Sequence, residues 1–592
     1  MNLLTTKILW SFCLMTNIAF IGVCCGAPPQ KECTAIELLP KSTIAYAKIS
    51  DLGELTKLIL EHPLRERLLS LPEYRAALKS GPFKQLQLGL AAFEGSMEQP
   101  WDQAVTKLTD GGITLTLDGS QGGFVVLLKS SDEATIDRFR SFVLALQQLQ
   151  NGGKAAKEGD YRKITAYSLN DQLKMAQMGH WLFLTNKSEL GKAVIDQYLD
   201  GTHDSLQSNQ QFQHALAKME SVDAQGGSLA AYVDVAAMQK AGIAKGMFSE
   251  KLDNIAVEVV LGGILANLRH APYATANLNV NVEGARLRLV TPHQRDWEAP
   301  REYFFGAPAL ASAPPLIEVK ERLFALSAHR DLSQMWLRAG DLLTDKANDG
   351  LAKADTQLTT FFSGRDFGED ILGSLSSGIQ FVAKPQDFTG TLPSPAIKLP
   401  TFAIQFAMKN PAETQPELRR VFQSFAGFFN VTSGANGRPQ LDVGMESLGK
   451  AQLITASFVP DRAQRESESA PIFFNFSPTL AFIGDRVILS SSLKLAKELV
   501  MQEQPAESPL QTSNTAVTLD ASVLRTILAA NKSQLVASNM LSKGQSQDSA
   551  EAEIGLLLEL ITFLKDAQLK LDTTDSQMQL SLDLHLGSGN AK

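Results

Sequence analysis

The stretch MGHWLFLTNKSELGKAVIDQYL, residues 178–199, decides how the rest of the chain is interpreted. A glycine turn leads into a short apolar strand, then a polar break, then an amphipathic helix. A second stretch, IGDRVILSSSLKLAKELV at 483–500, follows the same order. Laying Gly179 on Gly484 superimposes the apolar strand and the apolar helix positions of the two stretches. The chain therefore contains this element twice.

Other pieces of the two halves match in the same order. The strand-like segment 43–49 and the helix start at Asp51 correspond to segment 323–329 and Asp331. The remaining matched pieces are 112–115 with 378–381, 124–128 with 402–408, 229–233 with 515–519, and 276–282 with 578–586. Matches in a constant order predict an internal repeat.

The strand patterns predict antiparallel sheets. From Ala276 to Val282, apolar residues alternate with Asn277, Asn279 and Asn281, as in a strand with one wet face. Amphipathic helices, such as the one expected from Asp132, would cover the apolar face. We therefore expect an α+β fold of two tandem related domains, each an antiparallel sheet with helices packed on one face.

The composition sets the expected domain bounds. The chain has 592 residues, which exceeds a single core. The stretch 299–315 is rich in Pro, Ala and Gly and lacks a period, so it is the expected linker. The first repeat is then expected at 34–298 and the second at 316–588.

The N-terminus has the pattern of a secretory signal. Lys7 is the only charge before Lys31, an apolar run follows it, and Gly26-Ala27 supplies small residues. We expect a signal peptide at 1–27 and an exported protein, periplasmic or extracellular. The apolar run is long for a signal, so an uncleaved N-terminal membrane anchor is the alternative. No later segment is long and apolar enough to span a bilayer.

Charge and cysteine content exclude several classes of partner. The net charge of −8 argues against a nucleic-acid partner and against docking on an anionic membrane. Of the four cysteines, Cys33 alone lies beyond the expected signal region. A disulfide framework and a cysteine-based metal site are therefore not expected, and pairing of Cys33 between chains stays open.

Acidic residues recur where expected strands pass into helices. They are Asp51, Asp234, Asp331 and Asp520. As a set they could form a carboxylate constellation, but helix capping explains each of them better. Asn186, with Glu189 three residues later, is likewise an expected cap, and Ser491 keeps a capping side chain at the matching position.

Catalytic and metal signatures are missing from the sequence. None of the eight histidines stands in an HExxH or His-x-His pattern, and we expect His180 in a solvated turn. The run GSLSSG at 373–378 misses the G-x-S-x-G spacing, and no phosphate-binding glycine loop occurs. The tryptophans beyond the expected signal are expected as buried anchors; they are Trp101, Trp181, Trp297 and Trp336. We therefore expect no catalytic, cofactor-binding or metal-binding residues and no cofactor.

Short motifs point to a family. They are Leu39-Pro40, Thr43 and Tyr46, the strand and helix after Gly179, and Ser205-Leu206 with Phe212. In these motifs the chain resembles an uncharacterised family of exported bacterial proteins that carry a repeated domain of unknown function. The resemblance covers most of the chain after the signal. It implies export and a repeated α+β fold, and it brings no activity and no site residues.

These observations favour binding over catalysis. Matched positions of the two halves keep apolar character and helix caps, and no reactive group is shared. We expect an exported non-catalytic binding or scaffold protein. Its partner, a protein or another envelope component, would contact the inter-repeat cleft or exposed helix faces. The alternative is an envelope hydrolase whose site is assembled from dispersed residues.

Overall fold

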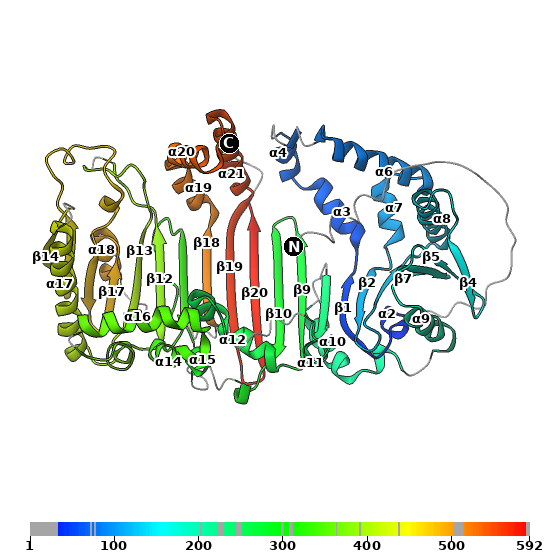
Figure 1. Cartoon of the computed structure of the whole chain (residues 1–592), viewed down its shortest axis with the longest axis horizontal. Helices are drawn as coiled ribbons and strands as arrows, with labels where there is room; N and C mark the ends of the chain where they lie inside the picture. The colour runs from blue at the N-terminus through cyan, green and yellow to red at the C-terminus, as the bar shows by residue number, and fades with distance from the viewer. Residues whose placement is uncertain are drawn as a thin grey trace. The chain divides into compact units, whose positions relative to one another are not determined.

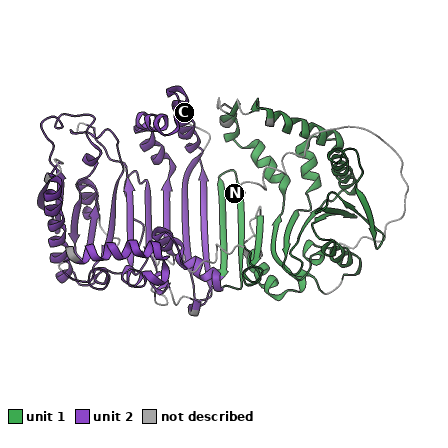
Figure 2. Cartoon of the chain, viewed as in Figure 1, with its two compact units in different colours: residues 1–245, 271–291, 588–592 green, residues 246–270, 292–587 purple. Residues whose placement is uncertain are grey.

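The chain folds into two compact units, which Figure 2 colours separately. Unit 1 comprises residues 1–245, 271–291 and 588–592, and unit 2 comprises residues 246–270 and 292–587. The structure is a computed structural model. It describes residues 33–70, 74–75, 78–201, 204–222, 229–243, 251–297, 301–306, 312–362, 364–389, 392–435, 439–502 and 513–587. The expected signal at 1–27 lies outside the described residues.

Unit 1 combines an antiparallel sheet with helices (Figure 1). Its strands are β1 Thr43–Ile49, β2 Ile113–Asp118, β3 Phe124–Lys129, β4 Lys157–Tyr161, β5 Ile164–Ser168, β6 Lys174–Met178, β7 Trp181–Thr185, β8 Leu229–Asp234, β9 Tyr273–Asn281 and β10 Gly284–Pro292. Its helices are α2 Ala35–Leu38, α3 Leu52–Glu61, α4 Leu64–Ser70, α6 Gly81–Met97, α7 Trp101–Leu108, α8 Glu133–Gln150, α9 Ser188–Asp200, η2 Leu206–Ser208, α10 Gln210–Val222 and α11 Val235–Lys240.

Unit 2 has the same kinds of element. Its strands are β11 Phe324–His329, β12 Gly378–Lys384, β13 Thr401–Ala407, β14 Leu441–Leu448, β15 Ala451–Phe458, β16 Thr479–Ile483, β17 Arg486–Ser490, β18 Ser513–Asp520, β19 Leu564–Thr573 and β20 Gln577–Leu586. Its helices are α12 Ile255–His270, η4 Arg295–Trp297, α13 Glu302–Phe305, α14 Leu332–Leu337, α15 Ala339–Leu342, α16 Asp345–Phe361, η6 Phe367–Ile371, η7 Leu372–Ser374, α17 Pro411–Ala435, η8 Ile472–Asn475, α18 Leu493–Met501, α19 Ala521–Ala530, α20 Lys532–Lys543 and α21 Gln547–Ile561.

The strands follow the same order in the two units. In unit 1 neighbours pair antiparallel in the order β4-β5-β6-β7-β3-β2-β1-β8-β9-β10. In unit 2 the order is β14-β15-β16-β17-β13-β12-β11-β18-β19-β20. The expected α+β class with antiparallel sheets is therefore confirmed.

The structure differs from the expected repeat in two details. The sequence matched 276–282, in β9, with 578–586, in β20. By place in the strand order, however, β9 of unit 1 corresponds to β19 of unit 2, and β10 corresponds to β20. Two alternating strands in succession look alike, so the pattern alone could not fix which was which. Helix α12 lies within the expected first repeat at 34–298 but belongs to unit 2. The arrangement as two tandem related domains stays a prediction.

Glycine turns set the register of the organising hairpins. Met178 pairs with Trp181 across the β6–β7 turn, where Gly179 has φ 57°. Ile483 pairs with Arg486 across the β16–β17 turn, where Gly484 has φ 59°. Two-residue turns of this kind need a left-handed conformation that glycine adopts without strain.

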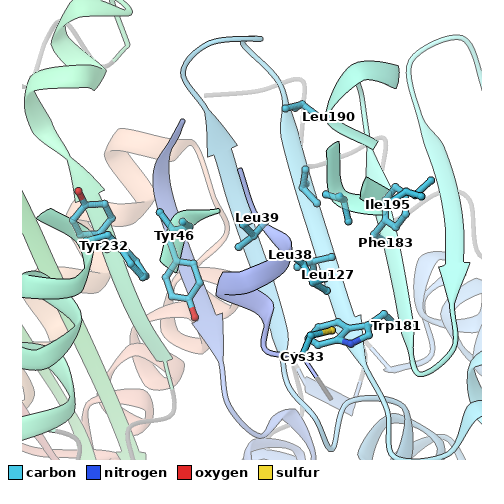
Figure 3. Packing of buried hydrophobic residues seen from close by; sticks show 14 of the residues in the cluster. Cys33, Leu38, Leu39, Tyr46, Leu127, Trp181, Phe183, Leu190, Ile195 and Tyr232 are labelled. Atoms are coloured by element: carbon cyan, nitrogen blue, oxygen red, sulfur yellow. The ribbon is translucent and has the colours of Figure 1, made fainter. Parts of the chain in front are cut away.

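Helices pack on both faces of the unit 1 sheet, and not on one face as expected. Along β7, Phe183 contacts the core that contains Leu190 and Ile195 of α9, as Figure 3 shows. Leu182, which points the opposite way, packs with Ile136 of α8. The strand is apolar on both sides, so it needs two covers.

Unit 2 is covered in the same two-sided manner. Ile488 of β17 packs with Leu495 and Leu499 of α18 on one face. Val487 packs with Phe422 of α17 on the other face. In each unit the helix after β3 or β13 and the helix after β7 or β17 therefore cover opposite sides of the sheet.

The described part of the expected linker, 299–315, packs inside unit 2. Tyr303, Phe304 and Phe305 of the short helix α13 are buried. Arg301 forms a fully buried ion pair with Glu258 of α12, with Nε 2.7 Å from Oε1. A buried pair of this kind is costly to break, because one partner alone would leave an uncompensated charge. The pair thus fixes α12 onto unit 2.

Candidate functional site

The recurring aspartates cap helices, as predicted. The carboxylate of Asp51 accepts from the N–H of Glu54 at 2.8 Å, and that of Asp234 accepts from Ala237 at 2.8 Å. Asp331 and Asp520 accept likewise at the starts of α14 and α19. Each carboxylate is used at its own helix, so the four do not form one site.

The predicted cap at Asn186 is wrong. Helix α9 is preceded by Lys187, which makes no side-chain cap. Asn186 Oδ1 instead accepts the backbone N–H of Phe124 at 2.8 Å. Ser491 Oγ, at the matching position, accepts the N–H of Phe402 at 2.8 Å. The two side chains close the end of the neighbouring strand, a contact between distant segments that a local pattern does not reveal.

The contacts and burial of His180, of the tryptophans and of Ser374 do not indicate a shared site. His180 lies in the turn between β6 and β7, as expected, but it is half-buried and not solvated, with Nδ1 3.0 Å from the carbonyl oxygen of Ser130. Trp181 is buried, as an anchor should be, whereas Trp101, Trp297 and Trp336 are half-buried. Ser374, in the run 373–378, donates to the carbonyl of Ile371. Among the residues that the structure describes, no group of three or more His, Cys, Asp or Glu could hold a metal ion.

One face of the unit 2 sheet is apolar and partly open. Residues paired across antiparallel strands point to the same side, so the register defines the face. We call the following residues the open face of unit 2: Phe324, Leu326, Phe381, Phe402, Ile404, Leu489, Val517, Leu519, Ala567, Leu569, Leu582 and Leu584. All are half-buried or exposed, and none is polar. Figure 1 shows β18, β19 and β20 side by side in this sheet.

An aromatic row crosses the open face of unit 2. Phe324 meets Phe381 edge-on with ring centroids 5.8 Å apart, and Phe381 stacks on Phe402 at 6.0 Å. Phe402 is 42% exposed, and Leu489 on the neighbouring strand is 48% exposed. Both strands lie inside the sheet, so their backbone groups are paired. The face therefore presents side chains and almost no hydrogen-bonding capacity.

The opposite face of this sheet holds the polar residues and is covered. Gln405 Nε2 donates to Gln380 Oε1 at 2.7 Å, and Gln380 Nε2 donates to the carbonyl of Pro315 at 2.5 Å. Ser327 Oγ donates to the carbonyl of Pro314. The segment around Pro314 and Pro315 lies across the sheet and satisfies these side chains. The sequence pattern, which expects polar residues to be wet, predicts the reverse.

Unit 1 has a corresponding open face. Its members are Ala45, Ala47, Leu115, Leu117, Phe124, Val126, Leu184, Ala231, Val233, Ala276, Leu278, Leu287 and Leu289. Leu115 and Leu117 are exposed, whereas Thr114 and Thr116, which alternate with them along β2, are buried. Asn277, expected on the wet side of its strand, is buried too. Val282, expected on the covered side, is 58% exposed. The expected assignment of wet and covered faces is wrong here.

Comparison with known proteins does not assign the chain to a family. No family model matches the chain, and no curated protein matches it. Solved structures that match include crystal form I of TP0453, with 9% identity, 44% of this chain and 79% of that chain covered, and a TM-score of 0.24. Crystal form III of TP0453 has 7% identity, covers 49% of this chain and 90% of that chain, and gives a TM-score of 0.24. At these scores the likeness carries no argument, and the resemblance drawn from short motifs stays a prediction.

Across the described ranges, none of the helices combines the length and the apolar character needed to cross a bilayer.

Proposed function

We propose that the chain is an exported, non-catalytic binding protein that holds an apolar ligand, an acyl chain, against the open faces of its sheets. The observation that carries this proposal is the exposure of Phe402 and Leu489 on interior strands of unit 2. Apolar side chains on a sheet face are ordinarily covered by helices or by another sheet. Here α17 covers the apolar side at Val487, whereas Leu489 and Phe402 on the same side stay exposed. We therefore place the ligand on sheet faces and not on helix faces.

The chemistry of the open face favours an acyl chain over a polypeptide. A polypeptide laid on it would bring peptide groups that need hydrogen-bond partners, and burying them unpaired is costly. Added strands bind at a sheet edge, whereas β13 and β17 are paired on both sides. A hydrocarbon chain needs no such partners and gains from each apolar side chain that it covers.

The expected energy is modest for each side chain and adds along the face. Full burial of a Leu or Phe side chain contributes about 1.5–3 kcal/mol. Leu489 is 48% exposed, so covering it should contribute about 1 kcal/mol. A loss of about 1 kcal/mol corresponds to roughly a fivefold weaker dissociation constant.

The test is a titration of the mature protein with a dansyl-labelled fatty acid, followed by fluorescence. Leu489→Gln should raise Kd about fivefold, and Phe402→Gln with Leu489→Gln should raise it about thirtyfold. Leu541→Gln is the matched control, because Leu541 is 88% exposed on α20, a helix that contributes no residue to the open face. The control should bind as the wild type does.

Two outcomes would count against the proposal. If Leu541→Gln weakens binding as much as Leu489→Gln, the probe does not select the open face. If the protein binds no acyl probe but hydrolyses an ester substrate, the alternative of an envelope hydrolase gains the support that the binding proposal loses.

A further inference from the structure

Two adjoining cavities lie along α9 in unit 1, on the covered face and away from the open face. The larger has a volume of about 780 Å³ and the smaller about 250 Å³. Tyr161, at the end of β4, lines both of them. We call the larger the basin and the smaller the inner cavity.

Small side chains create the inner cavity. Gly159 and Ala166 face it from the β4–β5 hairpin, and Gly191 faces it from α9. A Cβ added at Gly159 would meet nothing within 4 Å. Phe183 and Ile195, which lie close together in Figure 3, form the apolar part of its wall. Charged side chains line its rim: Glu158, Asp160, Lys174 and Lys192. An engineered apolar cavity of about 150 Å³ holds benzene, so the inner cavity has room for a medium-length alkyl chain.

The basin is polar and is built from several segments. Arg162 Nη1 lies 2.7 Å from Asp196 Oδ1, and its two terminal nitrogens pair with both oxygens of Asp200 at 2.6 and 2.7 Å. These hydrogen bonds lower the pKa of Asp200, so the pair stays charged. Tyr161 donates to the second oxygen of Asp196 at 3.1 Å, which raises the pKa of the tyrosine.

The turn of the β4–β5 hairpin has a strained backbone. Arg162 and Lys163 have φ of 56° and 70°, and residues other than glycine seldom adopt such values. The turn joins the paired residues Tyr161 and Ile164, so both turn positions need this conformation. Arg162 is thereby held over α9 at an energetic cost, which is typical of binding and functional sites.

A polar group in the floor of the basin has no partner. Gln197 is 9% exposed and lines the basin, and its amide oxygen has no hydrogen-bond partner among the residues that the structure describes. An unsatisfied buried acceptor costs about 1–3 kcal/mol, so such groups ordinarily serve a purpose. Rotation of the Gln197 side chain toward the basin would let a ligand hydroxyl supply the missing partner.

The charges of the basin favour a neutral head group. Asp196, Asp200 and Asp204 oppose Arg162 and Lys41, which leaves a charge of −1. An anionic head would meet the carboxylates, and a cationic head would compete with Arg162 for the same oxygens. Hydroxyl groups both donate and accept, so they can pair with Lys41, Gln197 and the carboxylates together.

We propose that the two cavities form one binding site for a small amphipathic molecule. Its alkyl group occupies the inner cavity, and its neutral, polyhydroxylated head occupies the basin. This site is independent of the acyl-binding open faces. The ligand class is that of an alkyl glycoside or a short-chain glycolipid.

The test is calorimetric titration of the full-length mature protein with n-octyl β-D-glucoside below its micelle concentration. Ala166→Leu fills the inner cavity and should weaken binding at least tenfold. Thr165→Leu is the matched control, because Thr165 is the exposed neighbour on the same strand and points away from the cavity. Gln197→Leu should weaken binding of octyl glucoside and leave binding of octan-1-ol unchanged, because the alcohol has no sugar head group to meet this side chain.

The head group is tested with glucose and with octyl sulfate, which should each bind at least tenfold more weakly than octyl glucoside. Unchanged binding in Ala166→Leu, or equal binding of glucose, would overturn the proposal. Leu489→Gln separates the two sites. If that variant weakens octyl glucoside binding and Ala166→Leu does not, the glycoside binds the open face and the site described here is refuted.

Discussion

Ser491 accepts a hydrogen bond from the backbone N–H of Phe402, which connects the end of β17 to the start of β13 at 2.8 Å. Ser491 is buried, and its hydroxyl also lies 3.0 Å from that of Thr401. The same closure recurs in unit 1 between Asn186 and Phe124. Strand ends that face helices need such partners, because a buried amide without an acceptor is costly.

Removal of this closure should destabilise unit 2. Ser491→Ala leaves the N–H of Phe402 without its acceptor, so the free energy of unfolding should fall by about 1–3 kcal/mol. Ser469→Ala is the control, because Ser469 is exposed in a loop of the same unit. Urea denaturation of both variants measures the difference. Equal stability of the two variants would show that water replaces the side chain at no cost.

The buried ion pair should be far more sensitive than surface pairs. Glu258→Gln keeps the shape of the side chain but removes the negative charge beside the buried guanidinium of Arg301, so we expect a loss of about 3–5 kcal/mol. Glu302→Gln changes an exposed neighbour of Arg301 and should lie within about 0.5 kcal/mol of the wild type. Denaturation at fixed pH compares them. A small effect of Glu258→Gln would mean that water enters beside Arg301.

The pH dependence of unit 2 should carry a contribution from His329. Burial lowers the pKa of His329, and the neighbouring Arg330 lowers it further, against an opposing effect of Asp331. The unfolded chain, with a pKa of about 6.5, therefore binds a proton at a higher pH than the folded chain does. Stability is then full above pH ~6.5 and falls as the pH drops from there toward the folded pKa.

The measurement for His329 compares thermal denaturation at pH 7.5 and pH 5.5. The wild type should lose more stability between these values than His329→Gln does, because the variant has no group to protonate there. His270→Gln, at an exposed site of the same unit, should follow the wild type. If His329→Gln and the wild type have the same pH dependence, the imidazole titrates alike in both states.

Two glycine substitutions should have opposite signs. Gly484 has φ 59°, so Gly484→Ala should cost about 1–2 kcal/mol, although open space surrounds the new Cβ. Gly555 lies inside helix α21 with equally open space, so Gly555→Ala should stabilise by about 0.5–1 kcal/mol. Denaturation curves of both variants test this. A stabilising Gly484→Ala would show that the turn relaxes to another type.

Sequence patterns predicted local features of this fold well. The turn at Gly179, the cap at Asp51 and the cap at Asp331 depend on residues close together in the chain. Their conformations follow from steric limits and from short-range hydrogen bonds, which sequence spacing reports directly. The constant order of matched segments also anticipated the common strand order of the two units.

The covering of each face could not be predicted in the same way. Alternation over 276–282 assigns Asn277 and Val282 to opposite faces but does not say which face is buried. That depends on distant segments, since Asn277 Nδ2 donates to the carbonyl of Met219 in α10. The residues 301–306 show no period because four helical residues are too few to display one. The cavity site could not be predicted either, because Tyr161 and Asp196 are distant in the sequence and come together only in the fold.

The distribution of unit 2 along the chain sets an order of events during synthesis. Arg330 is buried and donates to Asn514, which lies 184 residues further along the chain. A ribosome adding about 5–20 residues per second needs about 10–40 s to reach that partner. Until then β11 has β12 beside it but lacks its other neighbour, β18. The sheet of unit 2 therefore cannot be completed before its last strands, β18, β19 and β20, have been made.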